Sequence, residues 1–143
     1  NSPFGNYKKP NIVNETTLRA VSQYFQKADI SFYCEDYTSI LAQLPRGAFV
    51  YLDPPYDPVS DTANFTGYSR GGFSRKDQIS LKACCDDLHR RGIKFMLSNS
   101  ATAFIKELYK EYNILIVQAK RVVNSDASRR GEIAEVVVRN YEL

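Results

Sequence analysis

Two hydrophobic patterns alternate along the chain, one typical of helices and one typical of strands. Apolar residues at helical spacing predict helices over residues 15–28, 38–44, 75–91 and 101–112, and short apolar runs predict strands over residues 30–34, 49–52, 93–97, 114–117 and 133–138. Only a polar turn, residues 124–131, joins the last two strands, so they must pair antiparallel. We therefore expect an α/β sheet of parallel strands with an antiparallel last strand.

The strand predicted over residues 49–52 is followed by Asp53, Pro54, Pro55 and Tyr56. No polar residue interrupts the run, so we expect this strand to be buried on both faces. Proline cannot donate to a sheet ladder, so the strand ends at Asp53, at the carboxyl edge where open α/β sheets bind ligands. Pro55 keeps Pro54 extended, which lets the Pro54 carbonyl point into a cleft. The carboxylate and this carbonyl then offer two acceptors beside an aromatic ring, which suits a planar group that carries an amino function. A strand that simply ends in a proline turn is the alternative.

Two further segments have the composition of ligand contacts. Glu35 and Asp36 follow the strand predicted over residues 30–34, where an acid contacts a nucleotide-like ligand or, more simply, Asp36 caps the next helix. Residues 57–73 form a long polar loop with Phe65, Tyr68 and several glycines, which predicts a mobile lid over the site.

Composition narrows the class of protein. The 143 residues are 43% hydrophobic and 24% charged, which is ordinary for one soluble domain, and no apolar stretch approaches the ~18 residues of a membrane span. Three cysteines without a CxxC motif and a single histidine predict neither a disulfide framework nor a metal site, and they favour the cytoplasm. The net charge of +3 is gathered in small basic clusters, which indicates a polyanion partner or merely a solvated surface.

The ordered motifs resemble those of one enzyme family. The acid-Pro-Pro-Tyr tetrapeptide resembles motif IV of the amino-methyltransferases of DNA, and the surrounding motifs resemble the Dam-type (alpha-group) adenine-N6 DNA methyltransferases. These surrounding motifs are the segments at residues 3–10, 32–37 and 62–68, the pair Ser98-Asn99, and the arginine-rich turn with Glu135. The resemblance implies a class I, Rossmann-like methyltransferase sheet and S-adenosylmethionine as cofactor.

The resemblance also assigns roles to residues. Asp53, Pro54, Pro55 and Tyr56 would be catalytic. Cofactor binding would fall to Asp53, Tyr33, Cys34, Glu35 and Asp36. Contacts to DNA would come from Pro3, Tyr7, Lys8, Phe65, Tyr68, Arg121, Arg129 and Arg130. The family's amino-terminal cofactor segment and most of its target-recognition region have no counterpart here, so residues 1–13 would be the tail of that region and residues 14–143 the carboxyl-terminal part of the catalytic domain.

The sequence thus predicts an enzyme that transfers a methyl group to N6 of an adenine flipped out of double-stranded DNA, together with a missing amino-terminal half. A bacterial or phage protein of the cytoplasm, in a restriction-modification system or on its own, fits this prediction. A non-catalytic DNA-binding fragment and an N4-cytosine methyltransferase are the alternatives. The DNA sequence that is recognised stays open.

Overall fold

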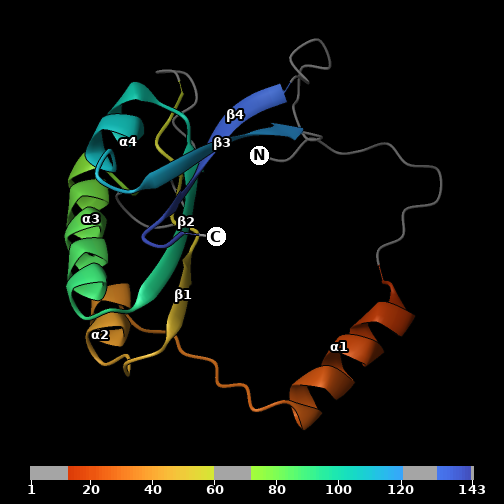
Figure 1. Cartoon of the computed structure of the whole chain (residues 1–143). Helices are drawn as coiled ribbons and strands as arrows, with labels where there is room; N and C mark the ends of the chain where they lie inside the picture. The colour runs from red at the N-terminus through yellow and green to blue at the C-terminus, as the bar shows by residue number, and fades with distance from the viewer. Residues whose placement is uncertain (1–12, 60–71, 121–131, 143) are drawn as a thin grey trace. The chain divides into compact units, whose positions relative to one another are not determined.

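A computed structural model describes residues 13–59, 72–120 and 132–142 (Figure 1). The chain divides into two compact units, Asn1–Glu35 and Asp36–Leu143, which are described separately. Within the described ranges, no helix has the length and apolar character needed to cross a membrane.

The described part of the first unit is built on helix α1, Glu15–Lys27. Asn14 caps it, because its side chain accepts a hydrogen bond from the Thr17 N–H at 3.2 Å. The strand predicted over residues 30–34 is wrong, since these residues have no regular structure and the residues at 31–34 are exposed. A strand is stable only when its backbone finds a ladder partner, and no described segment pairs with this one.

The second unit contains the other helices, each with a side-chain cap. These are α2 (Tyr37–Ala42), α3 (Arg75–Arg90) and α4 (Ala103–Leu108). Ser74 and Asp77 form a capping box at the start of α3. The helix predicted over residues 101–112 is shorter in the structure. Ser100 ends a strand, and Thr102 caps the shorter α4 by accepting from the Ile105 N–H at 3.2 Å.

Among the described residues the sheet has four strands, in the order β1-β2-β4-β3. They are β1 (Phe49–Leu52), β2 (Lys94–Ser100), β3 (Asn113–Lys120) and β4 (Glu132–Arg139). β1 and β2 are parallel, and β4 lies antiparallel between β2 and β3. The predicted parallel strands with an antiparallel last strand are confirmed, and the arrangement fits part of the Rossmann-like sheet expected from the sequence motifs.

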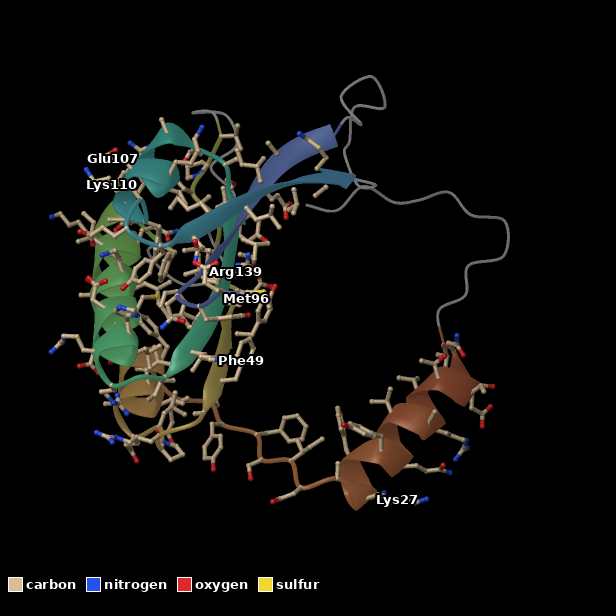
Figure 2. All side chains as sticks on the ribbon, in the orientation of Figure 1. Lys27, Phe49, Met96, Glu107, Lys110 and Arg139 are labelled. Atoms are coloured by element: carbon tan, nitrogen blue, oxygen red, sulfur yellow. The ribbon has the colours of Figure 1, made fainter. Side chains whose placement is uncertain are left out.

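Helices α2, α3 and α4 cover one face of this sheet (Figure 1). The core between them is apolar and includes Leu81 and Leu88 of α3 and Phe95 and Leu97 of β2. The side chains on the other face are more open, with Phe49 53% exposed and Tyr51 58% exposed (Figure 2). The prediction that β1 is buried on both faces is therefore wrong. Within the second unit, the described helices α2, α3 and α4 cover one side of the strand, so its side chains alternate between the core and the surface.

Candidate active site at the end of the first strand

Asp53 follows the last residue of β1, and a neighbouring strand fixes its carboxylate. The Ser98 hydroxyl of β2 donates to Asp53 Oδ1 at 2.8 Å, and the Tyr51 hydroxyl donates to Ser98 Oγ at 3.1 Å. Parallel pairing of β1 with β2 makes this possible, because it brings the carboxyl ends of both strands to the same edge of the sheet. Asp53 itself is exposed, so its carboxylate is both oriented and accessible.

Tyr56 is hydrogen-bonded to β4, the strand that pairs with β2. Its hydroxyl donates to Glu135 Oε2 of β4 at 3.5 Å, a long hydrogen bond that nevertheless sets the direction of the ring. The side chain is partly buried, and this burial raises the pKa of the Tyr56 phenol above its ordinary value. Tyr56 is therefore a neutral ring at neutral pH, which is suited to stacking on a planar ligand.

Buried side-chain amides hold the two-proline segment between Asp53 and Tyr56 through the Pro55 carbonyl. Gln78 Nε2 of α3 donates to the Pro55 carbonyl at 2.8 Å, and Asn99 Nδ2 of β2 donates to Gln78 Oε1 at 3.1 Å. Gln78 is 1% exposed and Asn99 is fully buried. Such groups cost free energy when they are unpaired, so the complete pairing marks this as a rigid part of the fold.

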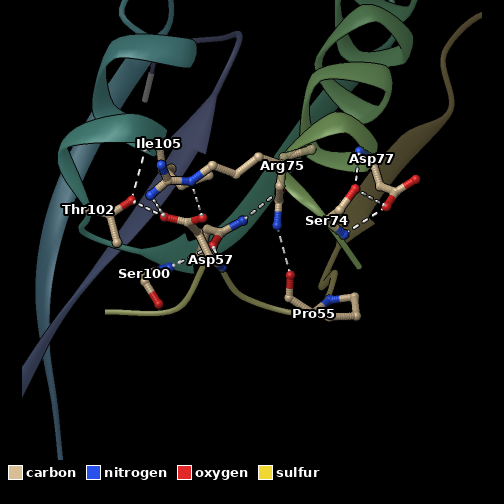
Figure 3. Close-up of polar contacts among 10 residues, drawn as sticks. Pro55, Asp57, Ser74, Arg75, Asp77, Ser100, Thr102 and Ile105 are labelled. Carbon is tan, nitrogen blue, oxygen red and sulfur yellow. Dashed lines mark hydrogen bonds and ion pairs between the residues drawn. The ribbon is translucent and has the colours of Figure 1, made fainter. Parts of the chain in front are cut away.

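Asp57 closes the same network one residue after Tyr56 (Figure 3). Its N–H donates to Asn99 Oδ1 at 2.9 Å, and its carboxylate accepts from Thr102 Oγ1 at 2.8 Å and from Arg75 Nε at 3.1 Å. The side chain is almost completely buried. The turn after β1 is thus fastened to α3, to β2 and to the start of α4.

Gln78 and Asp57 were not predicted as site residues. Gln78 shares one buried face of α3 with Leu81, Cys85 and Leu88, and a polar residue at such a position is a signal of a buried hydrogen bond. Ile79, the apolar residue next to Gln78, is instead 52% exposed.

A cavity of about 190 Å³ opens beside the prolines. Its walls are Tyr37, Tyr51, Leu52, Asp53, Pro54, Pro55, Phe73 and Leu81. The volume lies below the ~300–1,000 Å³ of pockets that enclose a whole drug-sized ligand. The aromatic and apolar walls, with the Asp53 carboxylate among the lining groups, suit a small planar ligand.

The predicted cofactor residues other than Asp53 are less well defined. Tyr33 is 69% exposed, and Cys34 is an exposed free thiol. Asp36 caps α2, and hydrogen bonds from the Thr38 hydroxyl and N–H hold the pKa of its carboxyl below the ordinary value. A role of these residues in cofactor binding stays a prediction. All eight predicted DNA contacts (Pro3, Tyr7, Lys8, Phe65, Tyr68, Arg121, Arg129 and Arg130) lie outside the described residues, as does most of the predicted lid.

The described ranges contain no group of three or more histidine, cysteine or acidic side chains placed to hold a metal ion. The described residues bring together an oriented carboxylate, an aromatic ring and an adjacent cavity.

Comparison with known proteins decides which family uses this arrangement. The model of the D12 class N6 adenine-specific DNA methyltransferases matches residues 1–123. The chain belongs to this family. It is 40% identical over 141 residues to the type II methyltransferase M1.LlaDCHI of Lactococcus lactis subsp. cremoris, a match that covers 99% of this chain and 50% of that protein.

Two further relatives come from distant organisms. The chain is 38% identical to the type II methyltransferase M.MjaIII of Methanocaldococcus jannaschii, covering 99% of this chain and 49% of that protein. It is 35% identical to the DNA adenine methylase of Escherichia coli K12, covering 96% of this chain and 48% of that protein. The chain thus spans about half the length of the relatives that it matches. The resemblance to adenine-N6 DNA methyltransferases inferred from the sequence motifs is confirmed at the level of the family.

Proposed function

We propose that this chain is the base-holding part of an enzyme that methylates N6 of adenine in double-stranded DNA. The observation that carries the proposal is the Asp53 carboxylate, oriented by Ser98 at 2.8 Å yet exposed, among the groups that line the cavity. Because the chain belongs to the N6 adenine-specific DNA methyltransferases, we propose that this acceptor binds the N6 amino group of adenine.

The chemistry follows from the electronic structure of adenine. The N6 lone pair is delocalised into the ring, so the nitrogen is a poor nucleophile. Acceptors for both N6 hydrogens, the Asp53 carboxylate and the Pro54 carbonyl, favour the pyramidal nitrogen that attacks a methyl group. N6 then loses one proton, and the carboxylate lies where that proton departs. In this direct displacement the bond from the methyl carbon to its leaving group breaks as the N6–carbon bond forms, and the leaving group takes the electron pair. The step needs mainly positioning, so no covalent enzyme intermediate is required.

The target base has to leave the DNA stack before it can reach Asp53. Tyr56 would then stack on the flipped adenine, and its hydrogen bond to Glu135 would keep the ring in place. Phe65 and Tyr68 would close over the base. Pro3, Tyr7, Lys8, Arg121, Arg129 and Arg130 would contact the DNA.

The methyl donor would be S-adenosylmethionine, whose sulfonium supplies an electrophilic methyl group when it is bound. Asp53 fits such a cation by its charge, and we propose Tyr33, Cys34, Glu35 and Asp36 as the residues that bind the remainder of the molecule. Because the chain spans half of its relatives, we propose that a second portion, equivalent to their amino-terminal half, completes the cofactor site. Residues 1–13 would then be the tail of the recognition region and residues 14–143 the carboxyl-terminal catalytic part.

Such an enzyme would work in the cytoplasm of a bacterium or in a phage-infected cell. The names of two relatives, both type II methyltransferases, support a place in a restriction-modification system.

The test is methyl transfer from tritiated S-adenosylmethionine to duplex DNA, followed by digestion and identification of the methylated nucleoside. The chain is assayed alone and mixed with the amino-terminal half of the Lactococcus lactis relative. We expect N6-methyladenine, at least from the mixture. Formation of N4-methylcytosine would contradict the proposal and would support the alternative of an N4-cytosine methyltransferase. DNA binding without any heat of S-adenosylmethionine binding and without transfer would support the non-catalytic fragment.

A further inference from the structure

The buried amides beneath the prolines have a fixed direction, because backbone donors determine it. The N–H groups of Asp57 and Ser100 both reach the side chain of Asn99 at 2.9 Å, and an N–H can only donate. The Asn99 atom that they meet must therefore be its oxygen. Its nitrogen then faces Gln78, which has to present its own oxygen and is left with its nitrogen toward the Pro55 carbonyl.

This chain of hydrogen bonds determines where the Pro55 carbonyl points. The carbonyl accepts from a side chain that is 1% exposed, so it is turned into the protein. The Pro54 carbonyl belongs to the preceding peptide plane. The proline ring locks φ of Pro55, so only ψ of Pro55 can still rotate one plane against the other. In extended backbone, consecutive carbonyls point in different directions. Holding the Pro55 carbonyl inward therefore directs the Pro54 carbonyl elsewhere. Both prolines line the cavity, which leaves the cavity open to the Pro54 carbonyl.

We propose that Gln78 is a positioning residue for the methyl-transfer reaction, which acts by holding the Pro55 carbonyl so that the Pro54 carbonyl faces the adenine amino group. The proposal rests on the function proposed above. It assigns to α3 a role in aiming the second acceptor, separate from that of Ser98, which orients the first. Asn99 supports Gln78 by fixing the amide in the orientation that can donate.

The test replaces Gln78 by methionine, which keeps the length of the side chain and removes both hydrogen bonds. Leu88→Ala is the matched control, because Leu88 is fully buried on the same face of α3 and takes no part in the network. The assay uses the form of the protein that shows methyl transfer, with or without the added amino-terminal half. We expect kcat to fall about tenfold to a hundredfold for Gln78→Met, the range for misplaced reacting groups. KM for DNA should change less than about twofold, because the predicted DNA contacts are untouched.

A merely structural role would give a different pattern. In that case Gln78→Met and Leu88→Ala, compared at equal folded fractions by circular dichroism, would have equal kcat values, and the proposal would be overturned. DNA with 2-aminopurine at the target position separates the two steps, since its fluorescence should still report base flipping in Gln78→Met.

Failure of the proposed function can be told apart from failure of this inference. If the parent protein transfers no methyl group to adenine, a crystal structure of Gln78→Met still shows whether the Pro54 carbonyl turns away from the cavity, as we expect, or stays, which contradicts the inference. If Gln78→Met does not fold, the hydrogen bond from Gln78 to the Pro55 carbonyl can be tested in the unmodified protein instead. A scalar coupling between Gln78 Nε2 and the Pro55 carbonyl carbon, measured by NMR across the hydrogen bond, is expected. Free rotation of the Gln78 amide would contradict the proposal.

Discussion

Asp53 and Asp36 are both acids predicted to follow a strand, yet their surroundings differ. Asp53 follows a strand that exists, and Ser98 of the neighbouring strand orients its carboxylate. Asp36 follows a segment without regular structure, and its carboxylate is occupied in capping α2. The same local pattern therefore produces a positioned, accessible acceptor in one place and a helix cap in the other. What separates the two acids is the strand before each of them. Among the described residues, β1 pairs with a neighbouring strand, whereas residues 30–34 pair with none.

The sharpest test of this contrast is the removal of the accessible charge of Asp53. Asp53→Ala in the active form should lower methyl transfer about a thousandfold or more, the upper range for losing one oriented hydrogen-bonding group in an active site. DNA binding should persist, because Asp53 would contact the flipped base and the methyl donor and is not among the proposed contacts to the remainder of the DNA. Glu107→Ala is the control, since Glu107 is an exposed acid paired with Lys110 at the far end of α4 (Figure 2). Turnover by Asp53→Ala close to that of the control would remove Asp53 from the mechanism.

The turn after β1 should contribute more to the free energy of unfolding than residues 30–35. Asp57→Ala leaves Thr102 and the exposed Arg75 without their shared acceptor, so the free energy of unfolding should fall by about 2 kcal/mol. Tyr33→Ala should change it by less than about 0.5 kcal/mol, because Tyr33 is 69% exposed. Urea unfolding of both variants measures this, and equal losses would show that residues 30–35 are held as firmly as the turn after β1.

Tyr56 should matter less to the reaction than Asp53. Tyr56→Ala removes the stacking ring and should lower methyl transfer about tenfold, the equivalent of ~1–3 kcal/mol of base stacking. Tyr56→Phe keeps the ring and loses only the long hydrogen bond to Glu135, so its effect should be smaller. Steady-state kinetics of the two variants decide the point. A loss for Tyr56→Ala as large as for Asp53→Ala would mean that Tyr56 does more than stack.

The smallest effect concerns the pH dependence of the α2 cap. Hydrogen bonds from the Thr38 hydroxyl and N–H lower the pKa of the Asp36 carboxyl in the folded chain. Its charged form therefore stabilises the fold above the unfolded carboxyl pKa of about 4, and this contribution disappears as the pH falls through the lower folded value. Asp36→Asn keeps a capping side chain without a titratable group. The difference in urea midpoint between the parent and Asp36→Asn should therefore shift against the parent between about pH 5 and pH 2. A difference that is constant with pH would contradict the cap.

Much of the fold follows from local sequence, whereas the support of the site does not. The strand before Asp53, the capping box of α3 and the antiparallel last strand are encoded by short-range patterns. The strand predicted over residues 30–34 fails because pairing is a property of the whole sheet. The links from Gln78 to Pro55 and from Asp57 to Thr102 join residues 23 and 45 positions apart, and periodicity does not reveal such contacts.

The most direct test of the central claim is a crystal structure of the active form with duplex DNA and a non-reactive analogue of S-adenosylmethionine. The account predicts a flipped adenine whose N6 lies at ~2.7–3.2 Å from both the Asp53 carboxylate and the Pro54 carbonyl. A cytosine in the site, or an adenine whose amino group meets neither acceptor, would contradict it.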